Sequence, residues 1–323
     1  MQEISKKNIR IWSRLGQRGT ICGVVLPELA EKRKIYVLTA DLEQLSGLER
    51  FKTNFPEYFL NMGIAEQNMI GVAAGLAFEG NVVFATTYAT FLTMRCYEQI
   101  RHNLGYQGAN VKLIGSSSGV AMGMSGNTHY TFEDIAIMRA IPNMMILSPA
   151  DSTEAYCMAH KVADYHGPVY LRLSGELNNP PVYEEGYEYK FGKASQFFEG
   201  KDVTIIATGS MVYESLEAVN LLNEMGIAAT VINMSVLKPL DYDIIKKNLN
   251  VELIVTVEEH SVIGGLGSAV AEFLSGLEKK PRQARIGIED QFLHPGEYEY
   301  LKQENGLTAE KIALRIKNEL KRN

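Results

Sequence analysis

Short apolar runs rich in β-branched residues alternate with longer amphipathic stretches along the first half of the chain. Five of these runs predict strands, at residues 34–39, 82–87, 111–115, 144–147 and 169–173. The stretches between them predict helices, for example at residues 66–78, 90–104 and 152–165. Strands that are apolar almost throughout and separated by helices are typical of a parallel sheet buried on both faces.

This alternation breaks off between residues 177 and 200, where Pro180, Pro181 and clusters of tyrosine and acidic residues leave little periodicity. We interpret this segment as a linker. A second series follows, with predicted strands at 203–207, 229–233, 253–257 and 285–288 and predicted helices at 212–224, 267–274 and 309–320. The expected fold class is α/β, with two domains at residues 1–176 and 201–323. Each domain is expected to hold a mostly parallel sheet with helices on both faces.

Composition narrows the function. The chain has 323 residues, 46% of them hydrophobic, which is enough for two cores. The net charge of −6 argues against a nucleic-acid partner, because such proteins carry a basic excess or stripe. The basic cluster at residues 6–18 is interpreted as a solvated helix face. No apolar run reaches the roughly 18 residues of a membrane span, and no secretion signal is recognised.

The three cysteines, Cys22, Cys96 and Cys157, are far apart and form no CxxC pair. This spacing argues against a disulfide framework and against a zinc site. It fits the reducing interior of a cell, so we expect a cytoplasmic protein.

Residues 61–69 form the most informative stretch, with the sequence Asn-Met-Gly-Ile-Ala-Glu-Gln-Asn-Met. A glycine turn leads into the helix predicted at 66–78, and Glu66 falls in its first turn. One interpretation is that this carboxylate simply suits the positive end of the helix dipole. The other is a functional carboxylate, because a buried, glycine-rich helix start is where a carboxyl group with altered proton affinity is found. The residues alone leave both interpretations open.

Two aromatic residues follow the strand predicted at 82–87. Tyr88 and Phe91 are three positions apart, so they lie on one face of the helix predicted to follow. Aromatic residues at this spacing belong to a core more often than to a cofactor pocket.

A glycine-rich loop at residues 119–129 follows the strand predicted at 111–115 and ends in Thr128 and His129. Glycines allow the backbone to approach a ligand closely. The carboxyl ends of parallel strands are where open α/β sheets bind ligands, which makes His129 a candidate site residue.

These three stretches together resemble the pyrimidine-binding domain of the transketolase family. The family pattern is a Gly-Ile-Ala-Glu-Gln-Asn segment, an aromatic pair before a helix, and a glycine loop that ends in Thr-His. Residues 202–210, 237–241 and 257–268 resemble the transketolase C-terminal domain. The resemblance extends from roughly residue 18 to residue 320.

The resemblance implies thiamine diphosphate as cofactor and transfer of a two-carbon ketol unit from a ketose to an aldose. Glu66 would hydrogen-bond N1′ of the aminopyrimidine and share its proton, which activates the thiazolium ring. Tyr88 and Phe91 would surround the pyrimidine, with Phe91 as the stacking residue and Met94 where relatives carry another aromatic residue. His129 would face the substrate and stabilise charge on its oxygen atoms.

The substrate positions depart from the family pattern. Relatives acting on sugar phosphates carry an aspartate where this chain has Ser125. They also carry a phosphate-binding histidine and arginine where it has Ser117 and Gly175. An arginine suits phosphate because it offers paired donors. Arg172 is a strand residue of a kind that relatives share, and Arg18 is a candidate for an anion site. We therefore expect a donor with a modified tail, such as a sulfonated, deoxy or branched ketose, or one whose phosphate the partner chain binds.

The chain lacks the Gly-Asp-Gly motif that, with a later asparagine, holds metal and diphosphate in this family. It also lacks a P-loop. The resemblance therefore implies half of a cofactor site, with no metal ligand assigned to this chain. Mg²⁺ and the diphosphate would be held by an N-terminal-type transketolase subunit in an α2β2 heterotetramer, and this chain alone would be inactive.

Three other interpretations stay open. The β subunit of a 2-oxo-acid dehydrogenase has the same two-domain plan and would transfer its product to a lipoyl acceptor. A 1-deoxyxylulose-phosphate synthase relative would require pyruvate. A non-catalytic partner that stabilises a separate thiamine enzyme would tolerate loss of Glu66. In the second domain, Glu258, Glu259 and His260 are interpreted as structural, because polar groups at such turns satisfy loop backbone.

Overall fold

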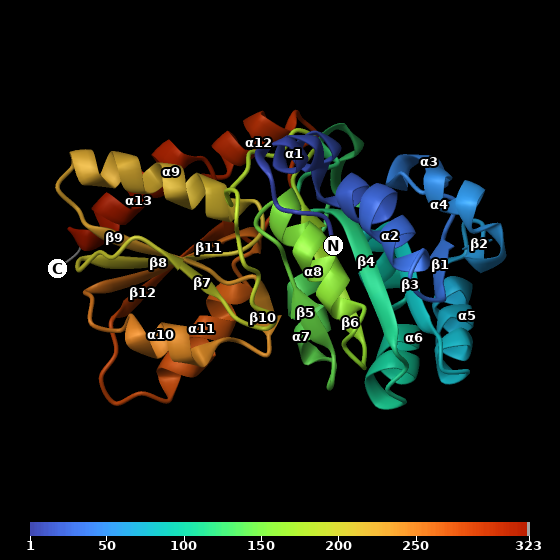
Figure 1. The fold of residues 1–323 in the computed structure, drawn as a ribbon. Coiled ribbons are helices and arrows are strands. Elements are labelled where there is room, and N and C mark those ends of the chain that lie inside the picture. Colours follow the sequence, from blue (N-terminus) through green and yellow to red (C-terminus); the bar gives the residue numbers. More distant parts are fainter. Residues whose placement is uncertain (322–323) are drawn as a thin grey trace.

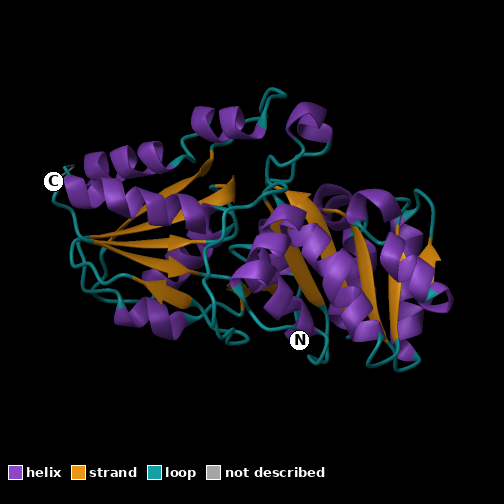
Figure 2. Cartoon of the chain, turned by 45° about the horizontal axis from the view of Figure 1, so that its top comes forward, coloured by secondary structure: helices purple, strands orange, loops and turns teal. Residues whose placement is uncertain are grey.

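The structure, a computed structural model, describes residues 1–321 and contains two β-sheets with helices packed around each (Figure 1). Figure 2 shows the two separate groups of strands, one in each half of the molecule, and the helices that cover them. Parallel neighbours predominate in both sheets. The predicted α/β fold class with two mostly parallel sheets is confirmed.

Seven strands form the first sheet, in the order β10-β5-β6-β4-β3-β1-β2, and β10 is antiparallel to its neighbour β5. The strands are β1 (Ile35–Thr39), β2 (Phe59–Asn61), β3 (Val82–Tyr88), β4 (Val111–Ser118), β5 (Met145–Leu147), β6 (Val169–Ser174) and β10 (Val236–Lys238). The sequence does not predict β2 and β10, because three residues are too few to show a period. Since β10 comes from the second half, both halves of the chain build this sheet.

The helices of the first half are α1 (Lys6–Thr20), α2 (Leu26–Ala30), α3 (Glu43–Ser46), α4 (Glu49–Asn54), α5 (Glu66–Phe78), α6 (Tyr97–Gln99), α7 (Asp134–Ala140) and α8 (Ser152–Val162). Side chains cap two of them: Ser5 accepts from the backbone N–H of Asn8 at the start of α1, and Asp151 accepts from that of Glu154 at the start of α8. Within residues 1–321, no helix combines the length and apolar character needed to cross a membrane.

The helix predicted at 90–104 differs from the structure. It consists of the short α6 between two π-helical segments, Phe91–Arg95 and Ile100–Tyr106. A π-helical turn is wider than an α-helical turn but is formed by the same residue types, so the pattern of apolar and polar positions does not reveal it. The wider turn changes the direction of the side chains at its end, among them Arg95.

The second sheet has five strands in the order β12-β11-β8-β9-β7. They are β7 (Ser195–Phe197), β8 (Val203–Ala207), β9 (Ala229–Asn233), β11 (Leu253–Ser261) and β12 (Arg282–Ile288). The helices are α9 (Met211–Glu224), α10 (Tyr242–Lys247), α11 (Leu266–Ser275), α12 (Tyr298–Glu304) and α13 (Ala309–Leu320). The strand β7 lies inside the predicted linker and pairs antiparallel with β9, so that end of the segment belongs to the sheet.

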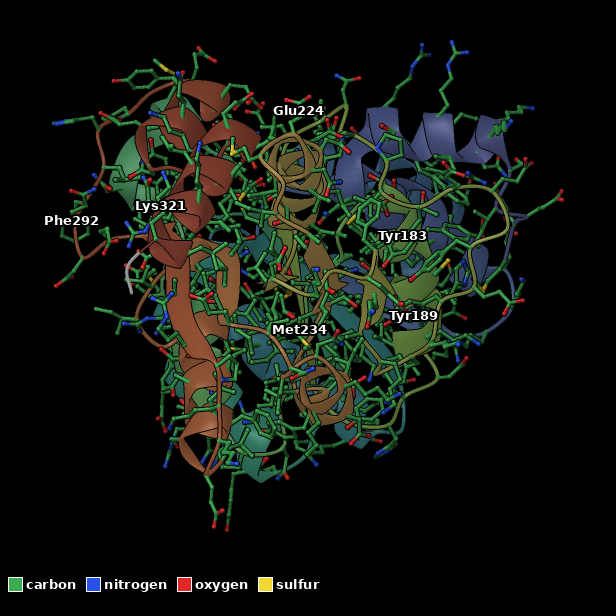
Figure 3. The ribbon with its side chains drawn as sticks, turned by 90° about the vertical axis from the view of Figure 1, so that its left-hand side faces the viewer. Tyr183, Tyr189, Glu224, Met234, Phe292 and Lys321 are labelled. Carbon is green, nitrogen blue, oxygen red and sulfur yellow. The ribbon has the colours of Figure 1, made fainter. Side chains whose placement is uncertain are left out.

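The rest of the predicted linker is packed against both halves. Tyr183, labelled in Figure 3, is 6% exposed and stacks on Tyr187 with 3.7 Å between ring centroids. Its hydroxyl accepts a hydrogen bond from Asn233 of β9 (2.8 Å). Asp151, at the start of α8, accepts from the backbone N–H groups of Val182 and Tyr183. These contacts tie the segment to both domains.

Buried carboxylates of β11 hold loops in place. The two oxygens of Glu258 accept from the backbone N–H groups of Leu266 and Gly267, each at 2.7 Å, and so fix the start of α11. Glu259 accepts from the N–H of Val120 across the domain boundary (2.7 Å). Burial raises the pKa of Glu258 to about 7. Both residues satisfy loop backbone groups, as the structural interpretation expects.

Candidate active site

Glu66 is held at the start of α5, where the sequence places it. The chain leaves β2 and turns at Gly63, whose φ of 67° is in the left-handed region. Glu66 is the first residue of α5 and is 4% exposed. Its two carboxylate oxygens lie 3.2 and 3.1 Å from Nη1 of Arg95. A buried carboxylate at a helix N-terminus thus has one cationic partner in the chain itself.

Arg95 also covers Phe91. The guanidinium carbon lies 4.0 Å from the centre of the Phe91 ring, which is a stacking distance. The backbone carbonyl of Arg95 accepts a hydrogen bond from the Gln67 side chain (2.9 Å). One guanidinium therefore contacts both the carboxylate and the aromatic face that the resemblance assigns to the pyrimidine.

Tyr88, Phe91 and His129 form an aromatic group beside this pair. The ring centres of Phe91 and His129 are 5.1 Å apart, and Tyr88 lies 5.8 Å from each of the other two rings. Tyr88 ends β3, Phe91 begins the next turn, and His129 lies on the loop after β4. The carboxyl ends of parallel strands meet at one edge, which brings these residues together.

The loop that carries His129 is braced by the second domain. The Asn127 side chain donates to the carbonyl of Leu293 (2.7 Å) and accepts from its N–H (3.1 Å). Gly126 has a φ of 71°, and a Cβ there would lie 3.1 Å from Pro295. Figure 3 shows the adjoining residue Phe292 on a projecting loop, and its side chain is 82% exposed. The C-terminal domain therefore helps to set the position of the His129 loop.

A cavity of about 420 Å³ adjoins the aromatic group, and Tyr88 is part of its wall. Ser117 and Gly175 both line it. The resemblance assigns the family's two phosphate-binding side chains to these positions, and both positions lie in one cavity. Arg18 lines it as well, with Nη1 3.4 Å from the Ser117 hydroxyl.

The backbone at Gly175 disfavours any larger residue, and a kink in α1 brings Arg18 to the cavity. Gly175 has a φ of 76°, and a Cβ there would lie 2.7 Å from the Asn179 amide. The helix α1 is kinked at Gly16, whose φ is 68°. Directly after the kink, Gln17 donates to the carbonyl of Pro149 (2.9 Å), which anchors the residue before Arg18.

Three other residues lie away from this cavity or are engaged elsewhere. Arg172 is 1% exposed and pairs with Asp134 through Nε (2.8 Å), so it is no substitute for the missing arginine. Met94 is 40% exposed and its sulfur accepts from the Thr90 hydroxyl (3.6 Å). Ser125 is exposed on the 3-10 turn Gly123–Thr128. Substrate and cofactor contacts of Met94 and Ser125 stay predictions.

Cys96 is next to Arg95, but its thiol is not activated as a nucleophile. Burial, and secondarily the Glu66 carboxylate, raise the pKa of its thiol to about 12. A thiol acts as a nucleophile through its thiolate, so Cys96 stays protonated and inert at neutral pH.

The sequence interpretation assigns no role to Arg95, although the spacing between Phe91 and Arg95 indicates one. Arg95 lies four positions after Phe91 and one turn of helix away, a spacing at which a cation can cover an aromatic ring. The sequence makes Arg18 a candidate for an anion site. Its position in the cavity depends on the kink of α1 at Gly16, which no sequence period predicts.

Two family domains match nearly the whole chain. Residues 20–180 match the transketolase pyrimidine binding domain, and residues 192–312 match the transketolase C-terminal domain.

Individual relatives agree with these domains. The chain is 40% identical over 298 residues to a 6-deoxy-6-sulfo-D-fructose transketolase subunit of Clostridium sp. (strain MSTE9), covering 91% of each protein. It is 42% identical over 270 residues to an apulose-4-phosphate transketolase subunit of Phocaeicola vulgatus, covering 82% of this chain and 85% of that protein. Among solved structures, it is similar to a split gene transketolase described as an inactive beta4 tetramer, with 39% identity and a TM-score of 0.86. That match covers 95% of this chain and 98% of the other.

Proposed function

Because this chain belongs to the transketolase family, we propose that it is one subunit of a thiamine-diphosphate-dependent transketolase. Its reaction is the transfer of a two-carbon ketol unit from a ketose donor to an aldose acceptor. The observation that carries the proposal is the buried carboxylate of Glu66, at one sheet edge with the rings of Phe91 and His129. The alternative of a non-catalytic subunit gives no reason for this arrangement.

The residues present fit the aminopyrimidine half of thiamine diphosphate. A buried carboxylate can hold the proton at N1′, and the Phe91 face can stack on a flat ring. When bound, the cofactor supplies a thiazolium carbon that can take up and release the ketol unit. His129 lies beside Phe91 and can donate a hydrogen bond to substrate oxygen atoms that gain negative charge. Covering these residues excludes water and strengthens each of these interactions.

The proposal includes a second chain, an N-terminal-type subunit that holds the diphosphate and Mg²⁺ in an α2β2 assembly. The missing Gly-Asp-Gly motif supports it. So do three exposed apolar residues: Ile64, two positions before Glu66, is 79% exposed, Met124, on the turn before His129, is 70% exposed, and Leu177, which lines the cavity, is 61% exposed. Exposed apolar groups clustered around a site are typical of a surface that another chain covers.

Thiamine diphosphate binding tests this proposal. We expect tight binding, measured by calorimetry with Mg²⁺, when the chain is combined with an N-terminal-type subunit, and none for either chain alone. A shared site has its contacts divided between two polypeptides, so neither half binds strongly. Tight binding by this chain alone would contradict the half-site proposal, and no binding by the mixture would contradict the function.

For the donor, we propose a ketose with an anionic tail that is phosphorylated or sulfonated. Two relatives are named for 6-deoxy-6-sulfofructose and for apulose 4-phosphate, and both names describe sugars with an anionic group. In this chain the cavity beside Tyr88 holds one cation, Arg18, near Ser117. A guanidinium next to hydroxyl donors suits either anion.

Replacing Arg18 by alanine is expected to raise KM for an anionic donor about 10- to 100-fold, because a hydrogen bond to a charged group contributes about 1.5–3 kcal/mol. The change in kcat should be much smaller, since the tail is remote from the reacting carbon. Steady-state kinetics of the assembled enzyme with an anionic ketose and its neutral analogue measures both. Arg14→Ala, exposed on the same helix, is the matched control. Equal effects of Arg18→Ala on both donors would contradict the assignment.

A further inference from the structure

The Arg95 side chain makes two contacts that coincide in one place. Its Nη1 lies 3.2 and 3.1 Å from the two oxygens of Glu66, and its guanidinium carbon lies 4.0 Å from the centre of the Phe91 ring. Under the function proposed above, on which this inference rests, an aminopyrimidine needs the same carboxylate and the same ring face. While the Arg95 guanidinium occupies the Glu66 carboxylate and the Phe91 ring face, an aminopyrimidine cannot contact either of them.

We propose that Arg95 is an internal occupant of the pyrimidine pocket. Its guanidinium takes the place of the aminopyrimidine ring in the empty site and leaves when the cofactor binds. A guanidinium is planar, offers N–H donors in its plane and stacks on aromatic faces. An aminopyrimidine that meets a carboxylate through N1′ has the same three properties. Arg95 is therefore a determinant of cofactor affinity that acts through Glu66 and Phe91.

The surroundings allow this exchange. The Arg95 side chain is 45% exposed, whereas Glu66 is 4% exposed, so the arginine reaches the carboxylate from the solvent side. The Arg95 backbone is held independently, because its carbonyl accepts from the Gln67 side chain. The side chain can thus rotate into solvent while the turn stays in place.

The exchange also explains how a free subunit tolerates an empty cofactor site. A buried carboxylate without a partner destabilises the fold, and Arg95 is the partner of Glu66 until the aminopyrimidine ring binds. The cofactor then binds only the fraction of molecules in which Arg95 has moved away. The apparent dissociation constant is larger than the intrinsic one by the inverse of that fraction.

Substituting Arg95 by methionine isolates this competition. Methionine has a similar length but cannot pair with a carboxylate. We expect the assembled enzyme with Arg95→Met to bind thiamine diphosphate, in the presence of Mg²⁺, about tenfold more tightly than the wild type in a calorimetric titration. Arg95→Lys keeps the charge without the planar group and should fall between the two. Arg101→Met is the matched control, because Arg101 is exposed and pairs with Glu98 at 3.7 Å on the same stretch.

A second readout separates the competition from a general structural role. The isolated chain with Arg95→Met should melt at a lower temperature than the wild type, whereas the cofactor-loaded assembly should not. Binding by Arg95→Met and Arg95→Lys that is equal to or weaker than wild-type binding overturns the inference, and the function stands. If the wild-type assembly binds no thiamine diphosphate, the proposed function is wrong and the inference falls with it.

Discussion

Replacing Glu66 by alanine is expected to lower kcat of the assembled enzyme by about 10²- to 10⁴-fold, the usual contribution of a positioned acid or base. The physical reason is that a buried carboxyl group at the start of α5 can hold the proton at N1′, and alanine has no group that can take its place. Glu66→Gln, which keeps the shape but cannot transfer the proton, should lose most of the same activity.

The fold should survive this change, which makes the result interpretable. Arg95 is 45% exposed, so the loss of its partner is compensated by water. Glu79→Ala is a suitable control, since Glu79 is an exposed carboxylate at the other end of the same helix. Product formation from a ketose donor, measured with equal amounts of partner subunit, gives the rates. Activity of Glu66→Ala within a few fold of wild type would favour the non-catalytic interpretation.

The long elements could be predicted from the sequence because their patterns are strong. The predicted strands at 203–207 and 229–233 and the predicted helices at 66–78 and 309–320 have the bounds that the structure gives to β8, β9, α5 and α13. The two strands are continuous β-branched runs and α13 has a sustained helical period, which leave little choice of boundary. The short strands β2, β7 and β10 depend on pairing with distant strands, which no local pattern records.

The sequence predicts which strand ends form the site, but it does not predict the contacts between the site's side chains. Glu66, Phe91 and His129 follow different strands of one sheet, and parallel strands put their carboxyl ends at one edge. The partner of Glu66 was not predictable. It depends on the π-helical turn that directs Arg95 back toward α5, and such a turn has no sequence period of its own.

The largest effect on stability is expected from Arg172→Met, with a loss of about 3–5 kcal/mol in the free energy of unfolding. Arg172 is 1% exposed and Asp134 is fully buried. Arg172 Nε lies 2.8 Å from Asp134 Oδ2, and its Nη2 donates to the carbonyl of Glu259 in the second domain (2.9 Å). Methionine matches much of the volume but leaves the Asp134 charge buried without a cation.

The remaining partners of Asp134 cannot replace the arginine. Tyr170 donates its hydroxyl proton to Oδ2 (2.7 Å), which is a neutral contact. Among the described residues Oδ1 has no hydrogen-bond partner, and the ring nitrogen of His260 is 3.8 Å away. Burial lowers the pKa of His260 to about 4, so near neutral pH it carries no compensating charge.

Urea unfolding of the isolated chain measures the loss of stability. A surface ion pair with the same nitrogen–oxygen distance serves as the reference. Arg33 lies 2.8 Å from Asp164, but the two side chains are 32% and 71% exposed. Arg33→Met should therefore cost less than about 1 kcal/mol. Adding Asp134→Asn to Arg172→Met removes the unpaired charge and should recover part of the lost stability. If Arg172→Met costs no more than Arg33→Met, the buried Arg172–Asp134 pair contributes no more to stability than an exposed pair, and the prediction is wrong. If the double variant recovers nothing, the cost comes from lost packing and hydrogen bonds around Arg172, not from the charge left on Asp134.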